Sequence, residues 1–231
     1  MKPQSSFLFV GFNCCAEKVL ANLLLEYPEA EFCLYAENLL PEKYPECRIV
    51  TRSISNNILD DIKVNLFSHI LIFAEDGVEV INADVDARNI FTAIQINKLL
   101  KKDAQIIIEL FNHNYTHLLK KYTSKNVEII YKEQLDANLI ANTIVSPGKT
   151  SDMWMEIANN QGNTLSSITP AELGVTDAIS LKDLNLKLLT KENPVIIMGY
   201  LPENSVIPIL NPSLDTILQN NSTIYILKKD K

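Results

Sequence analysis

The first 131 residues alternate short apolar runs with segments of helical periodicity. The apolar runs lie at residues 7–10, 32–35, 48–51, 69–73, 105–110 and 127–131. Between them, the most regular helical segment has Ala87, Ile90, Phe91 and Ile94 at positions i, i+3, i+4 and i+7. Strands that are apolar throughout, rather than alternating, belong to a sheet buried on both faces. The pattern therefore predicts an α/β fold with a doubly wound parallel sheet.

After residue 131 the pattern changes to helices without intervening strands. Apolar residues at 139, 140 and 144 predict one helix, which should end near Ser146-Pro147-Gly148. Met153, Trp154, Ile157 and Ala158 predict a second helix, whose apolar face has no obvious strand to cover it. Such a face packs either on a neighbouring chain or on the protein's own sheet, and the sequence leaves both alternatives open.

A smaller α+β unit is predicted from about residue 163 onward. Its strands are expected at 165–168, 194–200 and 223–227, with a helix at 181–189. Asn211-Pro212 and Asn220-Asn221 supply turn residues between these elements. We accordingly expect three parts, namely a sheet domain at 1–146, connecting helices at 147–162 and a C-terminal subdomain at 163–231.

Composition narrows the function classes. The chain has 231 residues and a formal net charge of −7, which argues against nucleic acid as a partner because phosphates require a basic face. No apolar run approaches the roughly 20 residues of a membrane-spanning helix, and the polar start argues against a signal peptide. Four cysteines without a CxxC pair are typical of small buried hydrophobes in a reducing compartment. We therefore expect a cytoplasmic protein.

The turn after the first apolar run is where a Rossmann-like sheet binds a dinucleotide. It reads Gly11-Phe12-Asn13-Cys14-Cys15-Ala16, so only the first glycine of G-x-G-x-x-G is present. The side chain of Asn13 would obstruct close approach of a phosphate. Gly11, Asn13 and Glu37, which follows the second strand and could bind a ribose, are the candidate cofactor residues. The degraded motif favours a turn that has lost its nucleotide pocket.

Two groups of residues could bind metal. Glu75, Asp76, Glu79, Asp84 and Asp86 follow the fourth strand, and hard cations such as Ca²⁺ take several carboxylate oxygens. The alternative is a solvated acidic loop before a helix whose dipole favours negative charge.

A second candidate group follows the fifth strand, which contains Glu109. His113 and His117 have the spacing of ligands on one helix face, or they are ordinary surface histidines. No nucleophile elbow, H-E-x-x-H motif or P-loop is present, so no catalytic residue is predicted and the chain is not expected to be an enzyme.

Several strings, in order, resemble the RCK domain, the regulator of potassium conductance found in channels and Trk/Ktr-type (TrkA-N/TrkA-C) uptake systems. They are FCLYAEN, HILIFAED with DARNIFTAIQINKL, AQIIIELFNHNYTHLLKK and VIIMGYLPENSVIPILNPSLDTILQNNSTIYIL. The stretch from DANLIANTIV to LSSITPAEL is most similar to the CASTOR/POLLUX-like ion-channel branch. The resemblance covers nearly the whole chain.

The resemblance implies a dimerising module with a helical crossover, whose pairs form a ring beneath a membrane pore, at the inner face of the membrane. It implies a divalent-cation site like that of calcium-gated members, with Glu109 and either Glu75 or Asp76 as ligands. Phe111 stands where a further acid would complete that set. The ligand is therefore unknown, with Ca²⁺ or another divalent cation favoured over a nucleotide.

The leading hypothesis is thus a cytosolic, ligand-sensing regulator of a potassium or related cation channel or transporter. An NAD(P)-dependent oxidoreductase is one alternative, although it needs a cofactor turn and a catalytic acid or base. A ligand-free scaffold of the same fold is the other.

Overall fold

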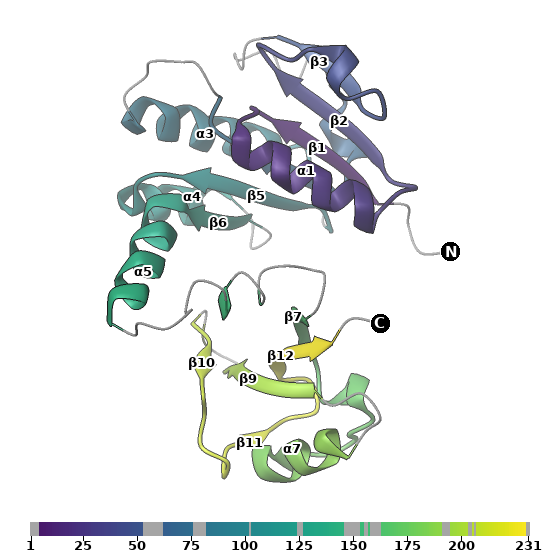
Figure 1. Cartoon of the computed structure of the whole chain (residues 1–231), viewed down its shortest axis with the longest axis vertical. Helices are drawn as coiled ribbons and strands as arrows, with labels where there is room; N and C mark the ends of the chain where they lie inside the picture. The colour runs from purple at the N-terminus through teal and green to yellow at the C-terminus, as the bar shows by residue number, and fades with distance from the viewer. Residues whose placement is uncertain are drawn as a thin grey trace. The chain divides into compact units, whose positions relative to one another are not determined.

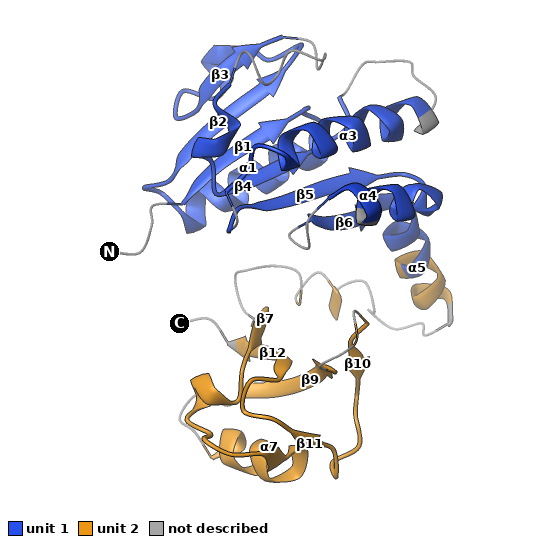
Figure 2. Cartoon of the chain, turned by 180° about the vertical axis from the view of Figure 1, so that it is seen from behind, with its two compact units in different colours: residues 1–138 blue, residues 139–231 orange. Residues whose placement is uncertain are grey.

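A computed structural model gives the fold of the chain. It describes residues 5–52, 62–75, 82–101, 103–123, 127–145, 153–154, 157, 163–190, 195–202, 205 and 207–229. The chain divides into two compact units, residues 1–138 and residues 139–231, which Figure 2 colours separately. The predicted division at 146 and 162 stays a prediction, because most of residues 146–162 lie outside the described part of the chain.

The first unit contains the predicted parallel sheet. Its strands, in spatial order, are β3 (Arg48–Thr51), β2 (Glu31–Ala36), β1 (Ser6–Val10), β4 (His69–Ile72), β5 (Gln105–Leu110) and β6 (Val127–Tyr131). Every neighbouring pair is parallel. The order 3-2-1-4-5-6 is that of the Rossmann-like sheet, so the predicted fold class is confirmed. The strand order reverses between β1 and β4, and ligands of such sheets bind at the carboxyl ends of these strands.

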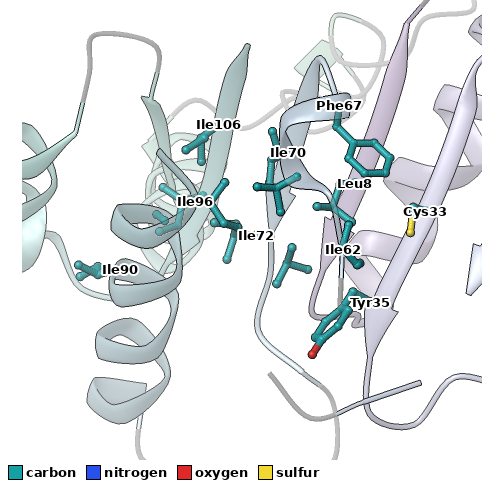
Figure 3. Close-up of a cluster of buried hydrophobic side chains, with 14 of the residues drawn as sticks. Leu8, Cys33, Tyr35, Ile62, Phe67, Ile70, Ile72, Ile90, Ile96 and Ile106 are labelled. Carbon is teal, nitrogen blue, oxygen red and sulfur yellow. The ribbon is translucent and has the colours of Figure 1, made fainter. Parts of the chain in front are cut away.

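Both faces of the sheet are buried. The described helices of this unit are α1 (Cys14–Glu26), α3 (Asn82–Asn97) and α4 (Thr116–Tyr122), and α5 (Lys132–Val145) begins in it and continues into the second unit. Short 3₁₀ turns lie at η1 (Pro41–Lys43), η2 (Val64–Leu66) and η3 (His113–Tyr115). Phe7 and Phe9 of β1 join the core beside α1, whereas Leu8 and Val10 join the core beside α3. Figure 1 shows the two helices, and Figure 3 shows Leu8 in the second of these cores. Successive strand residues point to opposite faces, which is why these strands are apolar throughout.

The buried face of α3 differs from the one that its apolar residues mark. Phe91 is 50% exposed and Ala87 is also exposed, whereas Asp86 and Asn89 are fully buried. The buried face of α3 is therefore shifted by about one residue from the face that its apolar residues predict. The physical reason is that two polar side chains face the sheet edge and form hydrogen bonds there.

Helix α5 begins at Lys132, directly after β6, and so extends further toward the N-terminus than the apolar residues at 139–144 predict. Ile140 and Ile144 lie one turn apart on this helix and are 62% and 74% exposed. Of the predicted second helix, Met153, Trp154 and Ile157 are described and helical. Met153 and Trp154 are exposed, and both alternatives for what covers this helix stay open.

The second unit is the predicted small α+β part. Its elements are β7 (Asn163–Ile168), η4 (Ala171–Leu173), β8 (Ile179–Ser180), α7 (Leu181–Leu189), β9 (Val195–Leu201), β10 (Ile209–Leu210), β11 (Ile217–Leu218) and β12 (Thr223–Lys229). An antiparallel sheet has the order β10-β9-β12-β7, and β8 pairs with β11. The core under α7 includes Leu184, Leu188 and Ile226. The two-residue strands β8, β10 and β11 were not predicted, because two residues carry no periodicity.

Glycine is required at one position of β9. A Cβ on Gly199 would lie 2.4 Å from the backbone oxygen of Ile209, so only glycine lets β10 approach. Asn211, just after β10, has a φ of 47°, a left-handed conformation that asparagine tolerates and that agrees with the predicted turn. Among the described residues, no helix is long and apolar enough to cross a bilayer.

Candidate functional site

Four polar side chains are buried at the carboxyl edge of the parallel sheet. They are Asn13, Asp86, Asn89 and Glu109, here called the carboxyl-edge cluster. Asn13 follows β1, Glu109 lies near the end of β5, and the other two lie on α3. Buried polar groups are unfavourable unless they form hydrogen bonds, so the partners of these four residues show what the cluster does.

Asn13 caps α1 and at the same time binds Glu109. Its Oδ1 accepts hydrogen bonds from the backbone nitrogens of Cys15 and Ala16, both at 2.9 Å. Its Nδ2 donates to Glu109 Oε2 at 3.0 Å. Gly11 has a φ of 77°, and its nitrogen donates to the carbonyl oxygen of Tyr35. The first helical N–H groups, which hold a phosphate in a nucleotide-binding turn, are thus occupied by the protein's own amide.

Glu109 connects four segments of the first unit. Besides Asn13, its Oε2 accepts from the backbone nitrogen of Ala74 at 3.2 Å, just beyond β4. Its Oε1 lies 3.9 Å from Nζ of Lys132, the first residue of α5. The carboxylate therefore links the β1–α1 turn, the end of β4, β5 and the start of α5.

Asp86 and Asn89 attach α3 to the residues that follow β5. The carboxylate of Asp86 accepts from the backbone nitrogens of Phe111 at 2.9 Å and Asn112 at 2.8 Å. Asn89 Nδ2 donates to the backbone oxygen of Glu109 at 3.2 Å. From the sequence, Asp86 is predicted only as one of several acidic residues near the start of a helix. Its burial has no signal in hydropathy, because an aspartate near the start of a helix is ordinarily solvated.

The side chain of Glu75 contacts the backbone of Glu37, and both are predicted site residues. Glu75 Oε1 accepts from the backbone nitrogen of Glu37 at 2.8 Å, and Glu75 Oε2 lies 3.5 Å from Nη1 of Arg88. Burial raises the pKa of the Glu75 carboxyl, although the bond from Glu37 and the charge of Arg88 oppose this. The side chain of Glu37 is exposed. Asp76 lies outside the described residues.

The described residues do not assemble a metal centre of the expected kind. Across those residues, no three or more His, Cys, Asp or Glu side chains are grouped as metal ligands would be. Glu109 and Glu75 are each engaged with nitrogen donors, as described above. His113 lies in η3 and His117 in α4, where its Nδ1 contacts the backbone oxygen of Asn114 at 2.9 Å. A cation at Glu109, Glu75 and Asp76 therefore stays a prediction.

Two cavities adjoin this edge. One, of about 230 Å³, lies beside β2 and is lined by Phe12, Asn13, Cys14, Glu17, Ala36, Asn38, Leu39, Leu40, Lys43, Tyr44 and Glu75. The other, of about 280 Å³, is lined by Phe111, Asn112, His113, Asn114, Tyr131, Glu133, Gln134 and Ala137. Of the four cysteines, Cys14 is exposed at the first cavity, whereas Cys33 is buried, which raises the pKa of its thiol to about 11.

No protein-family model and no curated protein matches the sequence, but solved structures match the fold. The human SLO3 gating ring aligns with 96% of this chain at a TM-score of 0.67 and 17% identity. At this identity the match shows that the two chains share a fold. The chain spans 44% of that structure's length. A GsuK channel bound to NAD aligns at a TM-score of 0.49 and 13% identity, over 98% of this chain and 36% of that one. The TrkA-N domain of the inner membrane protein ybaL from Escherichia coli aligns at a TM-score of 0.47 and 9% identity, over 62% of this chain and 99% of that one.

Proposed function

We propose that this chain is a regulatory module of the RCK type, which self-associates and couples a bound ligand to a potassium or related cation channel or transporter. The observation that supports this most is the match to the SLO3 gating ring, which covers 96% of the chain and so extends into both units. A membrane pore is then the partner, and the module lies at the inner face of the membrane. The CASTOR/POLLUX-like branch is the subfamily that we propose from the sequence strings.

Regulation in such a module requires two arrangements that a ligand binds with different affinity. The carboxyl-edge cluster offers a physical route for this. Glu109 contacts the β1–α1 turn and the first residue of α5, so a change at the sheet edge alters a contact of α5 directly. The last residues of α5 in turn belong to the second unit.

Helix α5 also offers the surface for self-association. Ile140 and Ile144 share one face with Ala137 and Ala141, and all four are exposed. An apolar helix face is ordinarily buried against another element. We propose that a second copy of the chain covers it.

The double variant Ile140→Glu/Ile144→Glu should weaken self-association at least tenfold. The two glutamate side chains would lose their hydration in the contact without gaining partners, which disfavours association. A loss of only about 1.4 kcal/mol of binding free energy already weakens the affinity tenfold. Sedimentation velocity between about 1 and 100 μM measures the dimer or ring directly.

The matched control is Asn138→Glu/Asn142→Glu. These exposed positions have the same spacing on the opposite side of α5, so the same charges are added without entering the proposed contact. This control should associate as the original chain does. A chain that is monomeric throughout the concentration range contradicts the proposed function.

Two ligand predictions from the sequence remain as proposals. A divalent cation is proposed at Glu109, Glu75 and Asp76, and a nucleotide, as the lesser candidate, at Gly11, Asn13 and Glu37. Binding at a hundredfold excess over Kd raises the free energy of unfolding by about 2.7 kcal/mol. A thermal-shift titration with Ca²⁺, Mg²⁺, NAD⁺ and ATP, repeated on Glu109→Ala, tests both. A cation shift that persists in Glu109→Ala rules this residue out as a ligand.

A further inference from the structure

One lysine lies beside the buried carboxylate of Glu109. Glu109 pairs with Ile130 in the register of β5 and β6, and Lys132 follows two residues later as the first residue of α5 (Figure 1). Its Nζ lies 3.9 Å from Glu109 Oε1. A positive charge in the first turn of a helix opposes the helix dipole, so α5 itself gains nothing from a lysine there. The charge of Lys132 is therefore placed for Glu109 rather than for its own helix.

The two oxygens of Glu109 have different surroundings. Oε2 accepts hydrogen bonds from Asn13 Nδ2 at 3.0 Å and from the backbone nitrogen of Ala74 at 3.2 Å. Oε1 has the ammonium group of Lys132 near it, but at a distance beyond that of a hydrogen bond. In Asp86, by contrast, each oxygen accepts from a backbone nitrogen, at 2.9 and 2.8 Å. Oε1 of Glu109 is thus stabilised by a charge, whereas these other carboxylate oxygens of the cluster are stabilised by hydrogen bonds.

Glu75, the other described acid of the predicted cation site, is balanced in the same way. Its Oε2 lies 3.5 Å from Nη1 of Arg88. The side chains of Glu75 and Glu109 are each 5% exposed, so little water screens the charges that act on them. Over these two acids and their two basic partners, the formal charges cancel. A metal cation at this edge would therefore be repelled by Arg88 and Lys132 as well as attracted by the acids.

We infer that Lys132 is the internal counter-ion of Glu109 and that its charge lowers the affinity of this sheet edge for a divalent metal cation at least tenfold. An ammonium group repels a doubly charged cation twice as strongly as a singly charged one at the same distance, so the effect is larger for Ca²⁺ than for K⁺. This deepens the proposed function by naming the residue that sets the cation affinity, and it rests on that function for the cation site at Glu109.

The test compares cation binding by the full chain and by variants that differ in one charge. Lys132→Gln should bind Ca²⁺ and Mg²⁺ at least tenfold more tightly than the original chain in isothermal titration calorimetry, with a smaller gain for K⁺ in a thermal-shift titration. Lys132→Arg keeps the charge and should bind as the original chain does. Lys121→Gln is the matched control, because Lys121 is exposed on α4 and the same charge is lost there. It should leave the affinity nearly unchanged, since water and salt screen an exposed charge.

A double variant ties the gain to Glu109. Adding Glu109→Gln to Lys132→Gln removes the carboxylate and should abolish the tighter binding. The inference is overturned by a gain that survives this second change, by a gain that Lys121→Gln reproduces, and by a Lys132→Gln chain that binds Ca²⁺ no better than the original. Lys132→Ala removes the same charge and replaces Lys132→Gln should that variant not fold. Self-association is measured separately, so a monomeric chain that shows the Lys132 effect rejects the proposed function and leaves this inference standing.

Discussion

Replacing Asp86 with alanine should lower the free energy of unfolding by about 3 kcal/mol. Asp86 is fully buried, and its two oxygens accept from the backbone nitrogens of Phe111 and Asn112 at 2.9 and 2.8 Å. Removing a charged acceptor leaves two N–H groups without a partner, and each unsatisfied buried group costs about 1–3 kcal/mol. Urea unfolding followed by far-UV circular dichroism measures the change in midpoint.

Asp84→Ala is the matched control for this experiment. Asp84 lies two residues earlier, in the first turn of α3, and it is exposed. Its loss should cost no more than the roughly 0.3–1 kcal/mol of a favourable charge near a helix start. Equal losses in the two variants would mean that Asp86 acts only through the helix dipole and not through its two backbone bonds.

The second large effect is expected from Asn13→Asp. Aspartate caps a helix as well as asparagine does, so the start of α1 is preserved. The variant instead places a carboxylate oxygen where Nδ2 now lies, 3.0 Å from Glu109 Oε2. Two like charges at that distance in a buried place cannot both ionise cheaply. We expect a loss of about 3 kcal/mol in the free energy of unfolding at pH 8.

This loss should depend on pH, with a sign that identifies its cause. In the folded variant the two carboxyls share a proton, so the apparent pKa of the pair rises above the ordinary value of about 4. The folded state then binds more protons than the unfolded state, and the penalty shrinks as the pH falls from 7 toward 5. Asn13→Ser, which keeps a capping oxygen but adds no charge, should lose only about 1 kcal/mol at any of these pH values. A pH-independent loss in Asn13→Asp contradicts the proximity to Glu109.

The sequence predicted those parts of the fold that periodicity reports. Strands β3, β5 and β6 and helix α7 have the predicted bounds, β1 and β4 differ from prediction by one residue at one end, and β2 differs by one residue at each end. These elements bury apolar side chains, and burial of apolar side chains is what an apolar run records. The resemblance to RCK domains was likewise carried by the order of such runs, and the match to the SLO3 gating ring bears it out at the level of the fold.

The candidate site was predicted only in part, because its residues are polar. The degraded glycine motif marked Gly11 and Asn13 as candidates, and the end of β5 marked Glu109. Nothing in the sequence indicates that Asn13 and Glu109, which are 96 positions apart, form a hydrogen bond. The burial of Asp86 and Asn89 was not predicted for the same reason. The predicted buried face of α3 was therefore wrong by about one residue. The partner that makes a buried polar residue favourable is set by tertiary structure, which a local pattern does not contain.

The bond between Asn13 and Glu109 has a consequence for how this turn can change by mutation. Glycine at position 13 alone would clear the turn for a phosphate, yet it would leave the carboxylate of Glu109 beside the cleared space with one fewer donor. Changing Glu109 alone would leave the amide of Asn13 across the turn. We therefore expect the two positions to be coupled: each single change removes one partner of this bond, so the effect of changing both should differ from the sum of the two single effects.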